Sequence, residues 1–288
     1  MRELLRANFR RLRWSKIFWI AFVGMLLWTV FLCVLQYVDQ LKYGDESYIV
    51  TLDEMLFRAE IVLGIVIAVF VSLFVGVEYG DGTIRNKILV GRKRRDIYMA
   101  NVVACGCAGL AVYGVSVGAA GILSMFLFAE SRLSLPELLG CCGIGAMMTL
   151  AFTAVFCLIA MLCANKTHTA VGCLLLSFLL MFGAIYVYQR LSEPEYVQQV
   201  SASETYSDVT VVTYATDLEL ETVPNPGYLS GVKREIYQFL LDVNPMGQAV
   251  QLSSLELVYP VRIVIYDLCI MGLTCLLGLA VFRKKDIK

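Results

Sequence analysis

The sequence predicts an all-α polytopic membrane protein with six transmembrane helices and with cytoplasmic N and C termini. Three observations favour this fold class: an apolar composition, six long apolar stretches, and basic residues gathered on one side of those stretches. Hydrophobic residues make up 59% of the 288 residues and charged residues only 17%. Soluble domains have about 45–50% apolar and about 25% charged residues. The composition also excludes a disordered chain, a basic nucleic-acid-binding protein and a small disulfide scaffold.

Six stretches are long enough to cross the membrane, for which a helix needs roughly 20 apolar residues. They are residues 17–38, 59–77, 98–128, 137–163, 170–188 and 261–282. The first stretch is too long for the apolar core of a signal peptide, and no small-residue cleavage site follows it, so we interpret it as a retained span. All 10 cysteines fall within these stretches, so no structural disulfide is expected.

The charges predict the orientation. With six spans, residues 1–16, 78–97, 164–169 and 283–288 share one side, which holds 17 of the 24 basic residues and 5 of the 24 acidic ones. The positive-inside rule makes that side cytoplasmic. The chain then divides into an interfacial segment 1–16, spans one to five over 17–188 with a loop at 78–97, an extracellular region 189–260, and a last span with a basic tail over 261–288.

The first segment, 1–16, has helical spacing of two kinds of residue. Arg2, Arg6, Arg10 and Arg13 form a basic face, and Leu4, Leu5, Phe9 and Leu12 form an apolar one. Such a helix lies in the membrane interface with its arginines near anionic lipid head groups. The alternative is a charge cluster that orients the chain without forming a helix.

The region 189–260 is predicted to be a small α+β unit on the extracellular side. Val209–Tyr214 and Leu218–Val223 have the composition of short strands, and a breaker cluster at Pro224–Gly227 follows. Val232–Val243 has helical spacing, Asn244–Pro245 stops that helix, and 246–257 is a candidate for a second helix. The low charge density suggests that this region rests on the outer face of the membrane.

The cytoplasmic loop 78–97 is the most informative segment. Gly82 interrupts the second span, Thr83 is a candidate cap for a short helix, and Gly91 can end that helix in a left-handed conformation. Ile84, Ile88 and Leu89 are expected to form an apolar ridge that docks into a groove of a partner. The alternative is a basic loop that only holds its flanking helices in place.

The residues of this loop carry a family resemblance. The run Glu78-Tyr79-x-x-Gly82-Thr83-Ile84-Arg85-Asn86-Lys87-x-Leu89-x-x-Gly91, followed by Arg94-x-x-Ile97-Tyr98, resembles the intracellular loop of ABC-2-type transporter permeases. The order of features over nearly the full chain is also similar to that family, and so is Asn244-Pro245. The long 189–260 insert departs from it.

The resemblance implies a function for the loop. In that family it forms the coupling helix, which sits in a cleft of a separate ATP-binding subunit. The implied coupling residues are Glu78, Gly82, Thr83, Ile84, Arg85, Asn86, Lys87, Ile88, Leu89, Gly91 and Arg94. Asn165, Lys166 and His168 match a second, smaller contact. The chain lacks a G-x-x-x-x-G-K-[ST] sequence, so ATP and Mg²⁺ are expected in the partner, present in two copies, and no cofactor is expected in this chain.

Charged residues near the ends of spans leave alternatives open. Glu78 could pair with Arg85 or with the N-terminal arginines, or it could be a solvated interface charge. His168 is interpreted as an interfacial polar residue rather than a catalyst. Arg262 and Asp267 are expected to reach the lipid head groups by snorkelling, although a buried charge in a span is often functional.

The sequence thus predicts the permease subunit of an ABC exporter in a bacterial cytoplasmic membrane. A second permease, identical or paralogous, is expected beside it. An apolar path between them suggests a hydrophobic or amphipathic substrate, such as a peptide antibiotic, a drug or a lipid-like molecule. A membrane-embedded enzyme is disfavoured because the single His lies in a loop. The remaining alternative is a non-transporting sensor or immunity protein that binds a toxin through 189–260.

Overall fold

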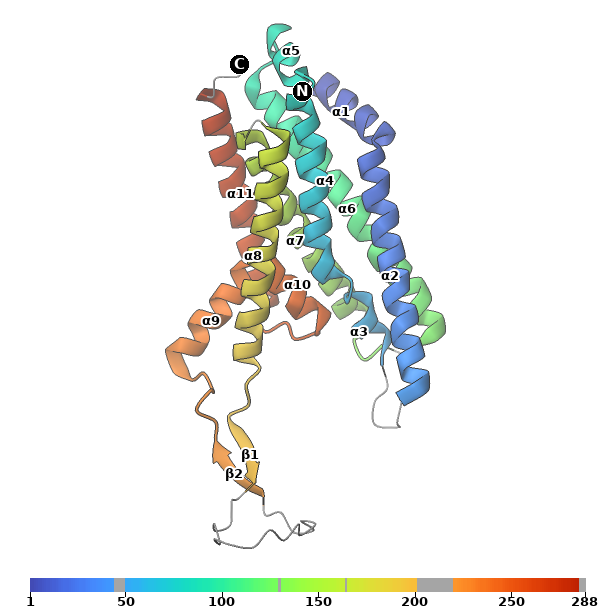
Figure 1. Cartoon of the computed structure of the whole chain (residues 1–288), viewed down its shortest axis with the longest axis vertical. Helices are drawn as coiled ribbons and strands as arrows, with labels where there is room; N and C mark the ends of the chain where they lie inside the picture. Colours follow the sequence, from blue (N-terminus) through green and yellow to red (C-terminus); the bar gives the residue numbers. More distant parts are fainter. Residues whose placement is uncertain (44–49, 129–130, 164, 201–219, 285–288) are drawn as a thin grey trace, which may run out of the picture.

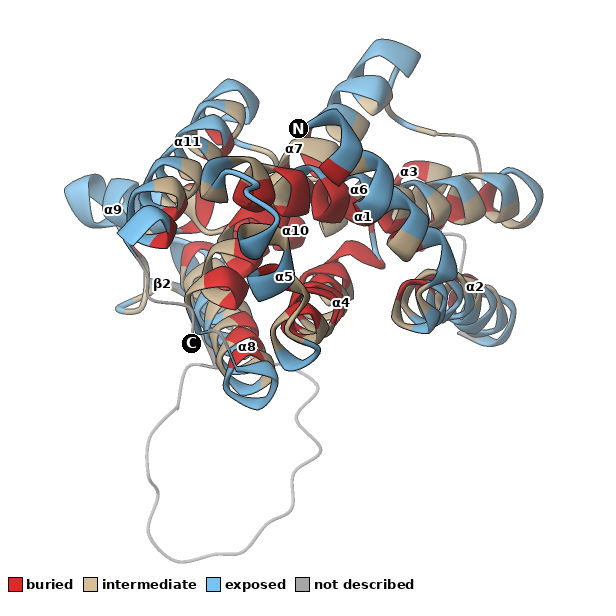
Figure 2. Ribbon diagram, turned by 90° about the horizontal axis from the view of Figure 1, so that it is seen from above, coloured by how far each residue is buried: buried red, intermediate tan, exposed pale blue. Residues whose placement is uncertain are grey.

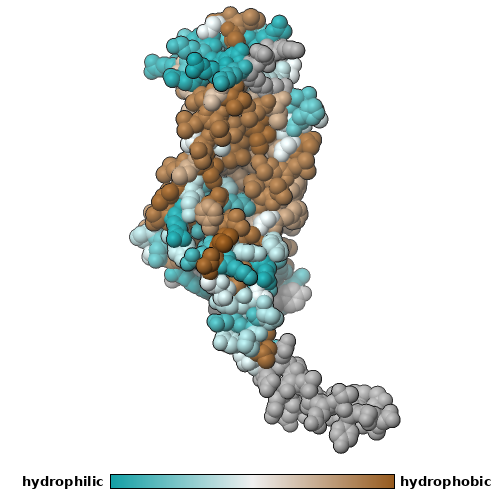
Figure 3. Space-filling model, turned by 90° about the vertical axis from the view of Figure 1, so that its left-hand side faces the viewer, coloured by the Kyte–Doolittle hydropathy of each residue, from teal (hydrophilic) through white to brown (hydrophobic). Residues whose placement is uncertain are grey.

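The computed structural model describes residues 1–43, 50–128, 131–163, 165–200 and 220–284. Within these ranges six helices are long and apolar enough to cross a membrane, which confirms the six predicted spans. These are α2 (Lys16–Tyr43), α4 (Glu60–Gly80) with the short α3 (Leu52–Leu56) before it, α6 (Arg94–Leu127), α7 (Leu135–Cys163), α8 (Lys166–Leu191) and α11 (Pro260–Lys284). Figure 3 shows the resulting apolar belt between two more polar ends.

The core of the bundle is formed by α4 and α7. More than half of the most apolar window of each is buried, against less than a third for the other four spans. Phe152 and Phe156 of α7 stack with their ring centroids 5.9 Å apart, and Leu63 and Ile67 of α4 are fully covered. Figure 2 shows this buried centre, with α2 exposed at one edge. Because lipid is as apolar as these side chains, close packing rather than exclusion from water holds such helices together.

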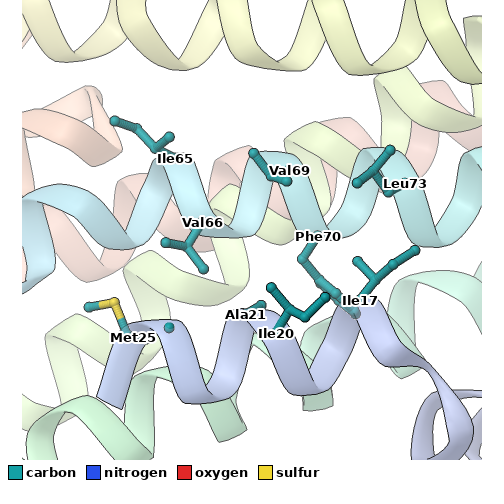
Figure 4. Close-up of a pocket in the computed structure, with 10 residues that line it drawn as sticks. Ile17, Ile20, Ala21, Met25, Ile65, Val66, Val69, Phe70 and Leu73 are labelled. Atoms are coloured by element: carbon teal, nitrogen blue, oxygen red, sulfur yellow. The ribbon is translucent and has the colours of Figure 1, made fainter. Parts of the chain in front are cut away.

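The helix α2 leaves an apolar groove against α4. Its walls are Ile17, Ile20, Ala21, Gly24 and Met25 of α2 and Ile65, Val66, Val69, Phe70 and Leu73 of α4. In Figure 4, Val66 and Phe70 of α4 point towards α2, whereas Ile65 and Leu73 point away from it. Beyond the groove, α2 is bound to α6 by a hydrogen bond between the hydroxyl groups of Thr29 and Ser116, which are 3.0 Å apart. The groove therefore offers an almost wholly apolar surface within the region of the spans.

The two ends of the bundle carry different elements (Figure 1). One end, the α5 end, holds α1 (Arg2–Trp14), α5 (Thr83–Leu89) and the last turn of α11. The opposite end, the hairpin end, holds β1 (Tyr196–Val200) and β2 (Leu220–Pro224). The predicted helix over the first segment is thus present, which sets aside the alternative of a charge cluster without a helix.

The strands differ in part from the prediction. β1 and β2 are antiparallel, with Val197 opposite Val223. The strand expected at Leu218–Val223 is present as β2 over its described part, from Leu220, and it extends to Pro224. Its partner β1 was not predicted, because Tyr196–Val200 contains two glutamines and no strong alternation. The strand expected at Val209–Tyr214 lies outside the described residues.

Two further helices lie near the hairpin end, α9 (Gly231–Val243) and α10 (Pro245–Ser253). Asn244 separates them as predicted. Its Oδ1 accepts from the backbone N–H of Met246 at 3.0 Å, which caps α10, and its Nδ2 donates to the carbonyl of Leu180 in α8 at 2.8 Å. Residues 245–252 are all buried, and α10 contacts α4, α7, α8 and α9. The expectation that this part rests on an outer face is therefore wrong for α10, which lies inside the bundle.

Gly247 is the point of closest approach within this segment. A Cβ atom at this position would overlap the backbone carbonyl oxygen of Leu241. We expect Gly247→Ala to lower the free energy of unfolding by about 1–3 kcal/mol, since backbone must shift to admit the methyl group. Gly272→Ala in α11 is the matched control, because nothing lies within 4 Å of its Cβ position. Thermal unfolding in mild detergent measures both, and equal midpoints would contradict the close approach.

Two acidic side chains of the spans, Asp267 and Glu60, have no exposed surface. Asp267 of α11 has no exposed surface and accepts from Gln248 of α10 at 3.0 Å, so the expectation that it snorkels to the head groups is wrong. A bonding partner on α10 makes burial possible. Arg262 is exposed, with its guanidinium 4.2 Å from the ring centre of Tyr259. Glu60 of α4 is also fully buried, and neither of its oxygens has a hydrogen-bond partner among the described residues.

Glu60 predicts a stabilising substitution. Burying a carboxyl group without a hydrogen-bond partner is costly. We expect Glu60→Gln to raise the free energy of unfolding by about 1 kcal/mol, because an amide of the same shape is neutral, whereas the carboxylate must be buried as a charge or take up a proton on folding. The control is Glu54→Gln, whose carboxylate is only partly buried and pairs with Arg132 at 3.2 Å. A lower unfolding midpoint for Glu60→Gln would show that the carboxylate has a charged partner.

Candidate functional site

The site is built around α5, a short helix set between two glycines. Gly82 has φ of 65° and Gly91 has φ of 80°, in the left-handed region that glycine adopts without strain. Gly82 itself occupies the N-cap position, so the prediction that Thr83 caps this helix is wrong. Because the chain reverses sharply after α4, Gly82 takes the turn. The Thr83 hydroxyl instead donates to the carbonyl of Glu78 at 3.1 Å.

The predicted apolar ridge of α5 is divided between two faces. Ile84 is fully buried and Ile88 packs partly against the core, whereas Leu89 is 74% exposed and Val90 is 76% exposed. Ile84 and Ile88 are four residues apart and share the face that rests on the bundle, and Leu89 is turned away by about 100°. The prediction that Ile84 takes part in an exposed ridge is therefore wrong. The exposed apolar tip consists of Leu89 and Val90.

Beneath α5 lies a buried carboxylate, that of Glu78 at the end of α4. It forms ion pairs with Arg11 of α1 and Lys87 of α5, and Asn101 of α6 donates to its second oxygen at 2.8 Å. The carboxylate has only 2% of its side-chain surface exposed. The interpretation as a solvated charge is therefore wrong. Pairing with an N-terminal arginine is confirmed for Arg11, whereas Arg85 is exposed and forms no ion pair with Glu78 among the described residues.

Asparagines complete this network. Asn8 of α1 donates to Asn101 at 2.7 Å, and the ammonium of Lys87 donates to Asn8 at 3.3 Å. The guanidinium carbon of Arg11 lies 3.8 Å from the ring centre of Phe74 in α4. We call Glu78, Arg11, Lys87, Asn8 and Asn101 the Glu78 cluster. It joins α1, α4, α5 and α6 through buried, charge-assisted contacts, so displacement of α5 must disturb α1 and α4.

Sequence reasoning missed Asn8 and Asn101, and it named the N-terminal arginines as partners of Glu78 without singling out Arg11. A signal for Asn101 was available, because an amide in a span otherwise apolar around it needs a partner. Asn8 and Arg11 offered no signal apart from spacing, because they sit among five other basic residues of the first segment. Arg2, Arg6, Arg10 and Arg13 are exposed as expected, while Leu4, Asn8 and Leu12 face the bundle. α1 thus has one basic face and one packed face.

The remaining predicted residues lie at the same end. Arg94 donates to the carbonyl of Phe282 in α11 at 3.3 Å. Asn165 caps α8 by accepting from the N–H groups of Thr167 and His168, at 2.9 and 3.3 Å. The Cα of Lys166 lies 3.2 Å from the Cβ position of Gly76, which places the α7–α8 connection beside α4. Asn86, Lys166 and His168 are exposed. No cluster of three acidic, His or Cys side chains that could hold a metal occurs in the described ranges.

Comparison with known families decides the identity. The model of a family described as ABC-2 family transporter protein matches residues 4–189, a stretch that includes α1, α5 and every member of the Glu78 cluster. The chain belongs to the ABC-2 family. No curated protein matches the sequence. This ABC-2 permease is therefore a multi-pass membrane protein and a membrane subunit of an ABC transporter. The β-hairpin, α9, α10 and α11 lie beyond the matched residues.

Proposed function

We propose that this permease is the membrane subunit of an ATP-driven exporter, and that α5 is the helix that docks into a separate ATP-binding subunit. The observation that carries the proposal is that the two faces of α5 have different surroundings. Its inner face is fixed to the bundle through Ile84 and the Glu78 cluster, while Leu89 and Val90 project outwards. Family members work with ABC ATP-binding subunits. Exposed apolar residues beside a rigid inner face suit a contact that transmits movement.

The proposed assembly contains two ATP-binding subunits and a second permease, identical or paralogous. ATP and Mg²⁺ bind to the partner subunits. The α5 end faces the cytoplasm, in keeping with the positive-inside rule, and α1 lies in the membrane interface with Arg2, Arg6, Arg10 and Arg13 towards lipid phosphates. Asn165, Lys166 and His168 form the second, smaller contact with the ATP-binding subunit.

The proposed substrate is hydrophobic or amphipathic. The apolar groove between α2 and α4 supports this, since its lining in Figure 4 consists of aliphatic and aromatic side chains together with Met25. A polar solute would find few hydrogen-bond partners there. ATP binding is proposed to close the ATP-binding subunits, and the α5 helices would then shift the spans. The substrate must bind the inward- and outward-facing states with different affinity.

Co-purification tests the proposal. The tagged chain is isolated from its native membrane in mild detergent, and the proteins that accompany it are identified by mass spectrometry. We expect a soluble protein with a P-loop at one copy per tagged chain if the second permease is identical, or two if it is paralogous, together with ATP-dependent movement of an amphipathic compound in liposomes. If the chain comes alone, the proposal is wrong and the sensor interpretation takes its place.

A further inference from the structure

The strongest unexplained feature is a buried polar cluster where α9, α10 and α11 meet near the hairpin end (Figure 1). Asp242 of α9, Gln248 and Gln251 of α10, and Asp267 of α11 are at most 1% exposed. The Gln248 amide donates to the carbonyl of Asp242 at 2.9 Å and to Oδ1 of Asp267 at 3.0 Å. One side chain therefore joins all three helices.

The hydrogen bonding between Gln248 and Asp267 leaves one oxygen of each side chain without a partner. Oδ2 of Asp267 and Oε1 of Gln248 are both buried, and neither has a hydrogen-bond partner in the described parts of the chain. With Asp267 ionised, both atoms can only accept, so each would lose its hydrogen bond at a cost of about 1–3 kcal/mol. A single proton on Oδ2 removes the charge and turns Oδ2 into a donor. A carboxylic acid and a carboxamide that already share one N–H···O bond can add the complementary O–H···O bond, which here would join Oδ2–H to Oε1.

The charges nearby give an ionised Asp267 no counterion. On α11 itself the near cation is Arg262, which is exposed and lies over Tyr259. α10 has no charged residue. α9 contributes Asp242, a second carboxyl, whose pKa is raised by burial although Gln238 and Gln251 donate to it and the charge of Arg262 acts in the opposite direction. The other charged residues of α9 are exposed and precede Asp242 by about two turns or more: Lys233, Arg234 and Glu235.

The two other helices that pack along α11 supply no counterion either. α7 carries cysteines and one charged side chain, Glu137, which is exposed and accepts from Ser134. α6 meets α11 at the opposite end, where Arg94 and Tyr98 donate to the carbonyls of Phe282 and Thr274. Among the described residues packed against Asp267, the donor is thus the neutral amide of Gln248 and none is a cation.

We propose that Asp267 is a proton-binding site, and that the bound proton joins α10 to α11 through Gln248. The ligand is a proton because one added hydrogen satisfies both unpartnered oxygens of the pair. The site lies outside the residues matched by the family, and the inference is independent of the proposed function of α5. Loss of the proton at alkaline pH leaves a buried carboxylate and weakens the contact between α10 and α11.

Infrared spectroscopy of the full chain in nanodiscs tests the site directly. A protonated carboxyl has a C=O stretch separate from that of a carboxylate. We expect this band at neutral pH in the wild-type protein, and we expect the component due to Asp267 to be lost in Asp267→Asn and retained in Asp242→Asn and Glu60→Gln. A spectrum unchanged by Asp267→Asn at every pH would overturn the proposal.

The pH dependence of stability gives a second, independent result. An asparagine at 267 keeps the shape of the acid and supplies an N–H donor to Oε1 of Gln248, so it imitates the protonated state. From about pH 5 to about pH 9, below the range in which lysine loses its proton, the wild-type midpoint should fall relative to that of Asp267→Asn, by roughly 2–4 °C. The sign follows because a proton held by the folded state is lost as pH rises.

Two outcomes contradict the proposal. The first is a difference between the wild-type and Asp267→Asn midpoints that does not change with pH. The second is a wild-type midpoint that rises with added Na⁺ or Ca²⁺ at constant ionic strength, without a protonated-carboxyl band, which would make the ligand a metal cation. If Asp267→Asn fails to fold, titration of the band in the double variant Glu60→Gln with Asp242→Asn decides instead, since the band that remains there must disappear as the pH is raised.

Discussion

Removing the Glu78 carboxylate is expected to unfold the α5 end of this permease. In Glu78→Ala, Arg11 and Lys87 lose their shared anion, and Asn101 loses its acceptor. Removing one partner of a buried ion pair lowers the free energy of unfolding by about 3–5 kcal/mol, because the remaining charge is left buried without a counterion. The expected result is a fall of the thermal midpoint together with proteolysis within α1, whose packed face depends on Asn8 and Arg11.

The chain offers a matched control for this prediction. Glu3 of α1 also pairs with an arginine of the loop, Arg92, but both side chains are exposed to solvent. Such surface pairs contribute about 0–1 kcal/mol, so Glu3→Ala should leave the midpoint almost unchanged. Glu78→Gln should lie between the two, since the amide can still accept from Asn101. Equal midpoints for Glu78→Ala and Glu3→Ala would show that burial of the Glu78 cluster has no energetic consequence.

Placing charge on the exposed tip of α5 is expected to abolish docking of the ATP-binding subunit. Leu89→Asp with Val90→Asp alters two side chains that are about three-quarters exposed, so the fold should tolerate the change. A desolvated apolar anchor at an interface is worth about 2 kcal/mol or more, so the affinity for the purified partner should fall at least about tenfold. Binding of the ATP-binding subunit to permease in nanodiscs measures this directly.

Two further variants separate docking from folding. Val232→Asp with Ile236→Asp places the same charges on exposed apolar positions of α9 at the opposite end, and it should leave the affinity unchanged. Ile84→Asp places a charge in the core and should destabilise the protein instead. If the Leu89 and Val90 variant binds its partner with wild-type affinity, these two residues are not the contact.

The sequence was most informative where a signal extends over many residues. Each span repeats its apolar character over about 20 positions, so all six were predictable, and glycine marked both ends of α5 because only it takes a positive φ without strain. The helix α1 was predictable from the alternation of leucine and arginine. For the same reason the orientation of Arg2, Arg6, Arg10 and Arg13 away from the bundle was predictable.

The partners of single polar residues were not predictable. Asn8 and Asn101 are 93 positions apart, and no local pattern relates them. The loop and the first segment each contain six arginines and lysines that could pair with Glu78. Which of them do so, Lys87 and Arg11, depends on how the helices pack. The burial of Ile84 and Asp267 has the same origin. Each depends on which neighbouring helix covers it, and that is a property of the assembled bundle.

The position of α10 also fixes the order in which the chain can be completed. At nine residues it is far too short to cross the bilayer, and its glutamines are poorly suited to lipid. It contacts α4, α7 and α8, all made before it, while its Gln248 bonds to a helix made after it. The buried position of α10 can therefore be completed only once α4, α7, α8 and α11 are all in place. In the proposed orientation, this means that the segment between α8 and α11 folds back against the bundle as the last span is added.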